Sequence, residues 1–277
     1  MNKEFSLTTS CGDKLSIAGY GLNNIDSSPC LIFVHGFKGF KDWGFFPFLG
    51  NYFSKKGFFV LTFNFSHNGI GSNQLEFSEM DKFAKNTISL EISELSDLIN
   101  AYFNGFFGKT VSEKVILVGH SRGGAVSLFS SLINKKPIAY VVWSSVANLD
   151  RYTERQKKEW RKNGFIEILN SRTKQLMKLG VNLLDDIESN TSSSLNIEKA
   201  VRTLNKPLLI IHGEEDLTVL PTEAEMIYDW SNKEITELVK IKNTGHTFGI
   251  VHPFENPTLA FNKVIQETEN FLLKLNN

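Results

Sequence analysis

Apolar residues in this chain gather in short continuous runs, and helix-like segments lie between them. Continuous runs rich in Val, Ile, Leu and Phe are typical of strands that are buried on both faces of a parallel sheet. The runs predicted as such strands are residues 30–34, 58–65, 115–118, 138–143, 207–211 and 238–241. Segments such as 88–102 and 261–275 instead repeat apolar residues at the i, i+3, i+4 spacing of an amphipathic helix. Strands that alternate with helices predict an α/β fold, with a mostly parallel, twisted sheet and helices on both faces.

Two parts of the chain interrupt this alternation. The first 20 residues contain two short extended runs around a turn at 11–13, which predicts an antiparallel hairpin at one edge of the sheet. Together with the hairpin, about eight strands are expected. Residues 147–202 contain helix-like pieces and no clear strand. We interpret 147–202 as a helical cap inserted into a single domain that spans residues 1–277.

Composition limits the possible functions. The 30 Lys and Arg residues balance 30 Asp and Glu residues, which argues against a nucleic-acid partner. Two cysteines, Cys11 and Cys30, are too few for a thiolate metal cluster, and no paired-histidine or phosphate-loop motif occurs. No metal and no cofactor are therefore expected. No stretch reaches the roughly 20 apolar residues of a membrane span, and the amino terminus has no signal-peptide pattern, so we expect a cytoplasmic protein.

The most informative motif is Gly119-His120-Ser121-Arg122-Gly123, which has the pattern G-x-S-x-G. It lies between a predicted strand and a predicted helix, and this context is that of a nucleophile elbow. The turn would present the Ser121 hydroxyl at a helix amino terminus, where partial positive charge favours a developing anion. We predict that Ser121 is a nucleophile; the alternative is an ordinary turn serine.

A nucleophilic serine needs a base, and the base needs an acid that orients it. In this architecture the order along the chain is serine, acid, histidine, each after the end of a strand. Asp216 follows the strand predicted at 207–211, and His246 follows the strand predicted at 238–241. We predict Asp216 as the acid and His246 as the base. Other carboxylates stay open as alternatives for the acid, namely Glu214, Glu215 and Asp150.

An oxyanion site is also predicted. His35-Gly36-Phe37 follows the strand at 30–34. In hydrolases of this architecture, a backbone N–H just after this strand acts together with the N–H that follows the nucleophile. The two donors would be those of Phe37 and Arg122. The alternative is that His35-Gly36 forms only a turn.

Four segments together resemble the α/β-hydrolase superfamily: HGF (35–37), GHSRGG (119–124), HGEEDLTV (212–219) and GHTF (245–248). The nearest likeness is to bacterial dienelactone-hydrolase and prolyl-oligopeptidase-like esterases, including the cinnamoyl (feruloyl) esterases. The resemblance covers about residues 30–270 and implies an α/β-hydrolase fold and a serine hydrolase that cleaves carboxylic esters. Arg122 departs from the pattern, because these esterases often carry Gln there. Since the backbone N–H is the donor, activity should survive, while the side chain would alter the charge of the pocket.

The expected partner is a small-molecule ester, of small to medium acyl or aryl type. The residues that we expect in the substrate pocket are Tyr152, Trp160 and Arg172 from the cap and His67 and His252 from the body. Arg172 is a candidate to hold a substrate carboxylate or hydroxyl, and otherwise a solvent-facing residue. Other functions stay open: a peptidase or thioesterase with the same triad, or a binding protein that retains the fold without catalysis.

Overall fold

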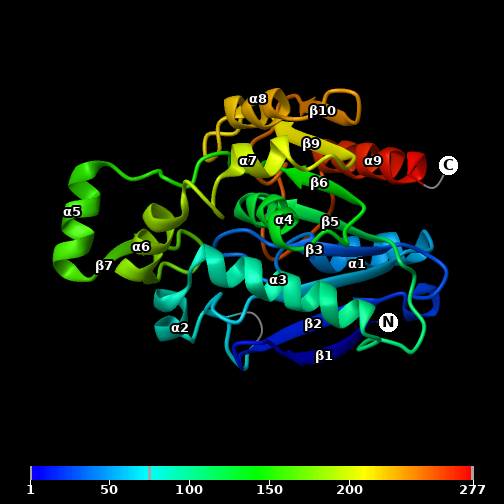
Figure 1. The fold of residues 1–277 in the computed structure, drawn as a ribbon, viewed down its shortest axis with the longest axis horizontal. Coiled ribbons are helices and arrows are strands. Elements are labelled where there is room, and N and C mark those ends of the chain that lie inside the picture. The colour runs from blue at the N-terminus through cyan, green and yellow to red at the C-terminus, as the bar shows by residue number, and fades with distance from the viewer. Residues whose placement is uncertain (1, 74–75, 276–277) are drawn as a thin grey trace.

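An eight-stranded sheet forms the centre of the computed structural model, which describes residues 2–73 and 76–275 (Figure 1). The strand order is β1-β2-β4-β3-β5-β6-β9-β10. The strands are β1 Asn2–Thr8, β2 Lys14–Tyr20, β3 Cys30–Val34, β4 Phe59–Asn64, β5 Val115–His120, β6 Ala139–Trp143, β9 Leu208–Gly213 and β10 Thr236–Ile241. Strand β2 is antiparallel to its neighbours β1 and β4, and the other pairs in this sheet are parallel. The predicted mostly parallel sheet with an antiparallel hairpin at its edge is therefore confirmed.

Helices cover both faces of the sheet, as predicted. They are α1 Phe46–Lys55 and α9 Leu259–Lys274 on one face, and α3 Ile88–Phe103, α4 Arg122–Ile133, α7 Ile197–Arg202 and α8 Pro221–Trp230 on the other. Successive side chains of a strand point to opposite faces, so each strand contributes to both cores. In β3, Leu31 and Phe33 pack with α1 and α9, while Ile32 and Val34 pack with α3 and α4. No helix in the described ranges has both the length and the apolar character that a membrane crossing needs.

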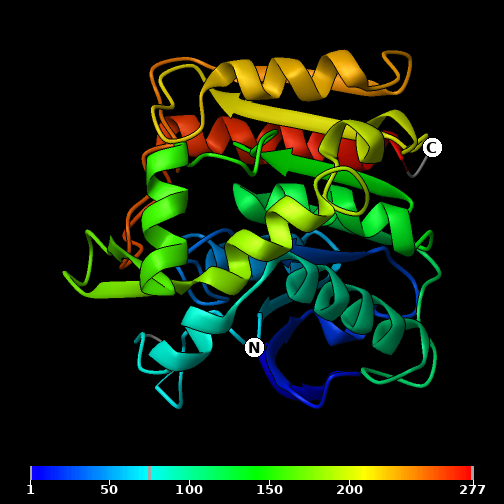
Figure 2. The same ribbon diagram turned by 60° about the vertical axis from the view of Figure 1, so that its left-hand side comes forward.

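The connection between β6 and β9, residues 144–207, contains α5 Glu154–Asn163, β7 Phe165–Leu169, β8 Leu176–Gly180, α6 Val181–Asn190 and α7. We refer to its part at residues 147–190, which ends with α6, as the insertion. Helix α7 packs against α4 and α8 and so belongs to the helix layer of the body. The elements from α5 to α6 project beyond the carboxyl ends of the parallel strands (Figures 1 and 2).

The prediction that residues 147–202 are helical is wrong at β7 and β8, which form an antiparallel hairpin. The burial of β8 follows the period of two that a strand requires, because Met177 and Leu179 are buried while Leu176 and Lys178 are exposed. The hairpin also packs against α2 Met80–Lys85 of the body. A strand of five residues has too few positions to be recognised by alternation alone, and here tertiary packing decides the structure.

Candidate active site

Ser121 lies in the sharp turn between β5 and α4. Its backbone has φ 57° and ψ −124°, a conformation that is rare for a residue with a side chain and that is often found at functional sites. The flanking glycines allow the turn: a Cβ on Gly119 would lie 2.4 Å from the oxygen of Gly123, and one on Gly123 would lie 2.2 Å from the oxygen of Val34. The N–H of Ser121 donates to the Trp143 carbonyl at 2.9 Å, which ties the turn to β6.

The structure brings Ser121, His246 and Asp216 into one chain of hydrogen bonds. His246 Nε2 lies 3.0 Å from Ser121 Oγ, and His246 Nδ1 lies 2.7 Å from Asp216 Oδ2. Because an ionised carboxylate only accepts hydrogen bonds, Nδ1 carries the proton and donates it to Asp216. Nε2 then directs its lone pair at the serine hydroxyl, which is the arrangement of a general base next to a nucleophile.

Asp216 is held rigidly and stays ionised. Its Oδ1 accepts hydrogen bonds from the N–H groups of Thr218 at 2.8 Å and Val219 at 2.9 Å. Its Oδ2 also lies 3.3 Å from His212 Nε2, beside the bond to His246. Burial alone would raise the pKa of Asp216, but the hydrogen bonds from His212 and His246 outweigh it and hold the pKa well below its usual range.

The alternative acids lie elsewhere. Glu214 and Glu215 are exposed, whereas Asp216 is buried. The carboxylate of Asp150 lies 2.7 Å from Lys157 Nζ on α5. Of the four carboxylates considered, Asp216 is the one that the structure places against His246.

A second histidine, His120, contacts the backbone of His246. His120 Nε2 donates to the backbone oxygen of His246 at 2.9 Å, and the two rings lie 4.9 Å apart. Burial, followed by the charge of His246, lowers the pKa of His120 to about 3. His120 is therefore neutral at physiological pH and positions the loop that carries His246.

Phe37 and Arg122, whose N–H groups are the predicted oxyanion donors, belong to the two loops that meet at Ser121. Gly36 packs directly on the serine, because a Cβ at Gly36 would lie 2.8 Å from Ser121 Cβ. The next N–H along the chain belongs to Phe37. Arg122 is the first residue of α4, so its N–H has no acceptor within the helix. Both residues therefore adjoin the Ser121 turn, where the carbonyl oxygen of a bound ester would become an oxyanion.

The Arg122 side chain, the departure from the family pattern, is neutralised by the body of the protein. Arg122 Nη2 lies 2.5 Å from Glu91 Oε1, and Glu91 also accepts a 2.7 Å hydrogen bond from Asn86. Burial raises the pKa of Glu91, and the Arg122 charge opposes that shift. The guanidinium also packs on the Phe37 ring, 4.6 Å from its centre. The expected change in pocket charge is therefore cancelled largely by Glu91.

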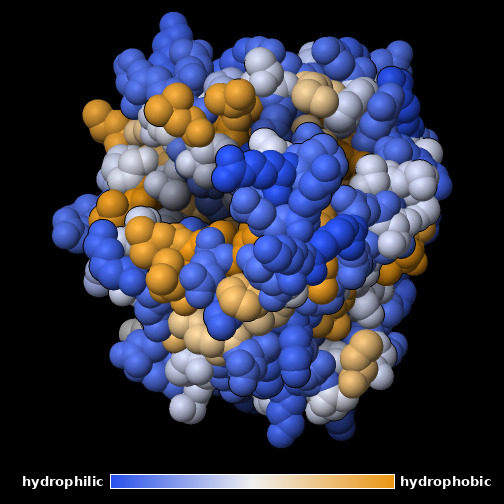
Figure 3. All heavy atoms as spheres, turned by 90° about the vertical axis from the view of Figure 1, so that its left-hand side faces the viewer, coloured by the Kyte–Doolittle hydropathy of each residue, from blue (hydrophilic) through white to orange (hydrophobic). Residues whose placement is uncertain are grey.

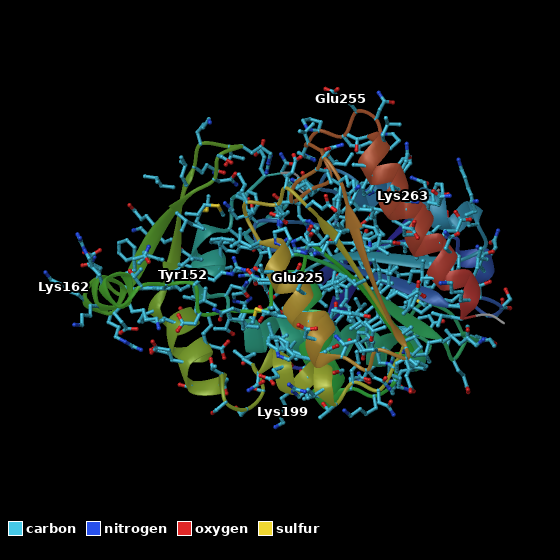
Figure 4. The ribbon with its side chains drawn as sticks, turned by 90° about the horizontal axis from the view of Figure 1, so that it is seen from above. Tyr152, Lys162, Lys199, Glu225, Glu255 and Lys263 are labelled. Atoms are coloured by element: carbon cyan, nitrogen blue, oxygen red, sulfur yellow. The ribbon has the colours of Figure 1, made fainter. Side chains whose placement is uncertain are left out.

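A cavity of about 690 Å³ opens at Ser121 and His246, which line it. Of the predicted pocket residues, Tyr152, Arg172 and His252 line this cavity. Tyr152 lies in the insertion near its junction with the body, as the view from above shows (Figure 4). Figure 3 looks onto this end of the molecule, where apolar side chains border hydrophilic ones.

Trp160 does not line the cavity, which corrects the prediction for this residue. It is fully buried inside the insertion, where its indole N–H donates to the Leu179 carbonyl at 2.8 Å. Its ring packs edge-on against Tyr152, with 4.9 Å between ring centres. An indole N–H needs an acceptor when it is buried, and the end of β8 provides it.

His67 also lies outside the cavity, and the prediction for it is corrected in the same way. Its Nδ1 is 2.7 Å from Ser66 Oγ, and Ser66 in turn donates to Glu94. Asp13, His67 and Glu94 each offer one possible metal-ligand atom within 4.8 Å of the others. The sequence could not indicate this group, because its members come from a turn, a loop and a helix.

Sequence reasoning missed several cavity residues. They are Lys38 next to Phe37, Arg151 next to Tyr152, and Leu183 and Ile187 on α6. The helical spacing of the two α6 residues could have suggested a common face. Nothing in the sequence indicated which face would be turned to the cavity.

Comparison with known proteins identifies the family. Residues 29–183, more than half of the chain, match the sequence model of a family described as alpha/beta hydrolase fold. A Mycoplasma genitalium protein named "Putative esterase/lipase 2" is 27% identical over 262 residues, covering 86% of this chain and 88% of that protein.

Solved structures show the same fold. Est1E from Butyrivibrio proteoclasticus, with ferulic acid bound, has a TM-score of 0.74 and 17% identity, over 98% of both chains. The α/β hydrolase GrgF from Penicillium sp. sh18 has a TM-score of 0.72 and 18% identity, over 99% of this chain and 98% of its own. The resemblance predicted from the four sequence motifs is confirmed, and the chain belongs to the α/β-hydrolase fold family.

Proposed function

We propose that this protein is an esterase that uses Ser121 as a nucleophile and cleaves small to medium carboxylic esters. The observation that carries the proposal is the position of His246, with Nε2 at 3.0 Å from Ser121 Oγ and Nδ1 at 2.7 Å from Asp216. The likeness to a protein named as an esterase/lipase supports the same reaction class.

The reaction would proceed in two halves. Ser121 Oγ attacks the acyl carbon while His246 Nε2 takes the hydroxyl proton, and Asp216 stabilises the imidazolium that forms. The carbonyl oxygen becomes an oxyanion and accepts hydrogen bonds from the N–H groups of Phe37 and Arg122. His246 then gives its proton to the leaving alcohol, and an acyl-enzyme remains. Water repeats the sequence, releasing the carboxylic acid and restoring the Ser121 hydroxyl.

The cavity supports the proposed size of the substrate. A volume of about 690 Å³ suits a small molecule, and much of the wall is apolar, as substrate sites commonly are. The insertion contributes Tyr152, Leu183 and Ile187 to this wall, and the body contributes residues such as Ile88 and Ile250. We propose that the insertion acts as a cap that shapes the pocket and limits the access of water to the acyl group.

A fluorophosphonate probe tests this function directly, because it labels a serine only when a base activates it. We expect wild-type protein to take up the label and Ser121→Ala to take up none. Ser131→Ala is the matched control, since Ser131 is a buried serine at the far end of α4 that bonds to a carbonyl of its own helix. Folded wild-type protein that stays unlabelled would indicate a binding protein without catalysis and would end the proposal.

A further inference from the structure

The charges on the wall of the cavity are all of one sign. Among the described residues that line it are four cations, Lys38, Arg122, Arg151 and Arg172, and no aspartate or glutamate. The whole chain carries 30 basic and 30 acidic residues, so this bias is local to the cavity. A cavity lined with charges of one sign favours a ligand of the other sign.

Two of the four cations are neutralised by the protein itself. Arg122 pairs with the buried Glu91 at 2.5 Å. Arg151 pairs with Glu223 at the start of α8. Neither guanidinium therefore leaves an uncompensated charge in the cavity.

Lys38 and Arg172 have no carboxylate within ion-pair distance in the part of the chain that the structure describes. Lys38 is half-buried, with Nζ 3.5 Å from the Leu169 carbonyl. The Arg172 guanidinium lies over the rings of Phe40 and Phe77, 5.6 Å and 5.8 Å from their centres, and keeps access to solvent at the cavity. Lys38 is half-buried and Arg172 is exposed, and burial lowers the pKa of both side chains.

Buried lysines elsewhere in the protein are paired with carboxylates, unlike Lys38 and Arg172. The Lys41 side chain is 3% exposed and lies 2.7 Å from Asp42 and 3.2 Å from Glu4. The Lys157 side chain, 11% exposed, lies 2.7 Å from Asp150. The protein pairs the lysines that it buries with carboxylates, whereas Lys38 and Arg172, which remain accessible at the cavity, have no protein anion beside them.

The two unpaired cations lie on segments that face each other. Lys38 is in the loop that follows β3, and its amine reaches Leu169, the last residue of β7. Arg172 is in the turn between β7 and β8, and it packs on Phe40 of the first loop. The loop that supplies the Phe37 oxyanion donor and the tip of the hairpin thus form one positively charged section of the cavity wall.

We propose that Lys38 and Arg172 bind a carboxylate of the substrate, so that the enzyme acts on esters that also carry a free carboxylate group. This inference rests on the proposed esterase function and narrows its substrate class. A guanidinium presents paired N–H donors that match the two oxygens of a carboxylate, and the amine adds a second charge-assisted hydrogen bond. Bound there, the anion would supply the negative charge that the cavity wall lacks.

Matched pairs of esters test the proposal on either side of the scissile bond. Monomethyl adipate and methyl hexanoate differ by a carboxylate on the acyl side, and 4-acetoxybenzoate and 4-acetoxybenzamide differ by one on the alcohol side. For one of the two pairs we expect wild-type kcat/KM, measured by chromatography of the products, to be about tenfold or more higher for the carboxylate member, the scale of one charge-assisted contact.

Substitutions then assign the preference to the two side chains. Lys38→Met and Arg172→Met should each reduce the carboxylate-to-neutral ratio about fivefold or more, while Lys38→Arg should retain it. The control is Lys178→Met, because Lys178 is an exposed lysine on β8, in the same hairpin, and lies outside the cavity lining. Equal rates within both wild-type pairs, or ratios that neither Met substitution changes, would overturn the inference while leaving the esterase function intact.

A binding measurement, which needs no turnover, tests the carboxylate site separately from the esterase function. If wild-type protein hydrolyses none of the four esters and takes up no fluorophosphonate, the proposed function fails. Calorimetry of hexanoate against hexanamide then still tests the anion site on wild-type protein. Tighter binding of hexanoate that is lost in Arg172→Met supports the site, and equal binding of the two ligands overturns it.

Discussion

The guanidinium of Arg122 lies 4.6 Å from the centre of the Phe37 ring, so the two residues that we predict as oxyanion donors also pack on each other. Arg122 is held in this position by Glu91 of α3, at 2.5 Å, and Glu91 is 1% exposed. The ion pair between Glu91 of α3 and Arg122 of α4 therefore links α3 to the two strand-end loops that we propose as the oxyanion site.

Glu91→Gln tests this connection. Removing one partner of a buried ion pair leaves the other charge uncompensated, so we expect a loss of roughly 3 kcal/mol in the free energy of unfolding. With Arg122 no longer held, kcat should fall more than KM rises, because the oxyanion exists only in the transition state. The measurements are urea unfolding and steady-state kinetics with a neutral ester.

The control for Glu91→Gln is Glu79→Gln. Glu79 pairs with Lys82 on the surface, where both side chains are well exposed. An exposed pair contributes at most about 1 kcal/mol. Similar small losses in the free energy of unfolding of both variants would show that the ion pair of Glu91 does not organise the site.

The acid of the triad is tested by comparing two aspartates. Asp216→Asn should reduce kcat about ten-thousandfold, because an amide cannot hold His246 in the tautomer that accepts the serine proton. Asp150→Asn should have little effect, since the Asp150 carboxylate pairs with Lys157 rather than with a catalytic group. A larger loss of kcat in the Asp150 variant would reverse the assignment.

The pH dependence of kcat/KM should report the base. Hydrogen bonds hold the pKa of Asp216 well below its usual range, and burial lowers the pKa of His120 to about 3. Neither group changes charge between about pH 4 and pH 8, so neither of them accounts for a change of kcat/KM in this window. A protonated imidazole cannot accept the Ser121 proton, and kcat/KM should therefore fall as the pH decreases.

Recovery of full activity on return to pH 8 is the control that excludes unfolding as the cause. A rate that stays constant down to about pH 4 would be incompatible with a histidine base.

Glu94 should make the protein less stable as the pH rises, whereas a salt-bridged carboxylate makes a protein more stable as the pH rises. Burial, opposed in part by hydrogen bonds from Ser66, raises the pKa of Glu94 from 4.5 to about 7. The folded protein thus binds this proton more tightly than the unfolded chain, and the free energy of unfolding falls as the pH rises from 4.5 to 7. Glu94→Gln cannot ionise and should escape this loss, which is on the order of 3 kcal/mol.

The experiment is urea unfolding of wild type and Glu94→Gln at pH 4.5 and pH 8. It is done with a chelator present, so that no divalent cation bound near Asp13 and His67 compensates the carboxylate. The variant should gain stability over wild type mainly at pH 8. A difference between the two proteins that is the same at both pH values would refute the role given to Glu94.

Much of the site could be predicted because parallel strands bring distant loops to one edge. Ser121, Asp216 and His246 each follow the carboxyl end of a strand, so local motifs and chain order were enough to place them together. The same argument led to the prediction of Phe37 and Arg122 as oxyanion donors. The positions of these residues follow from where strands end, and runs of apolar residues indicate those ends well.

The insertion was harder to predict, because its structure depends on contacts with the body. The β7–β8 hairpin packs on α2, and a Cβ at Gly180 would lie 2.6 Å from the oxygen of Ala84, a closeness that no local pattern reveals. Trp160 illustrates the same limit. A large aromatic side chain suits a pocket wall, but the sequence does not specify which way the ring faces. The structure places it in the interior of the insertion rather than at the cavity.

The last prediction concerns the insertion as a determinant of acyl-chain length. Leu183 and Ile187 of α6 line the cavity, and each buried methylene of a substrate chain contributes about 0.8 kcal/mol when it is removed from water. Leu183→Ala and Ile187→Ala widen the cavity at this wall and remove part of that contact. We therefore expect kcat/KM for p-nitrophenyl octanoate to fall severalfold relative to that for the acetate. Leu176→Ala is the control, because Leu176 is an exposed leucine of β8 outside the cavity lining. If the ranking of acetate, butyrate and octanoate is the same in all three variants and in wild type, α6 does not set chain-length preference, and the insertion is a cover rather than a specificity element.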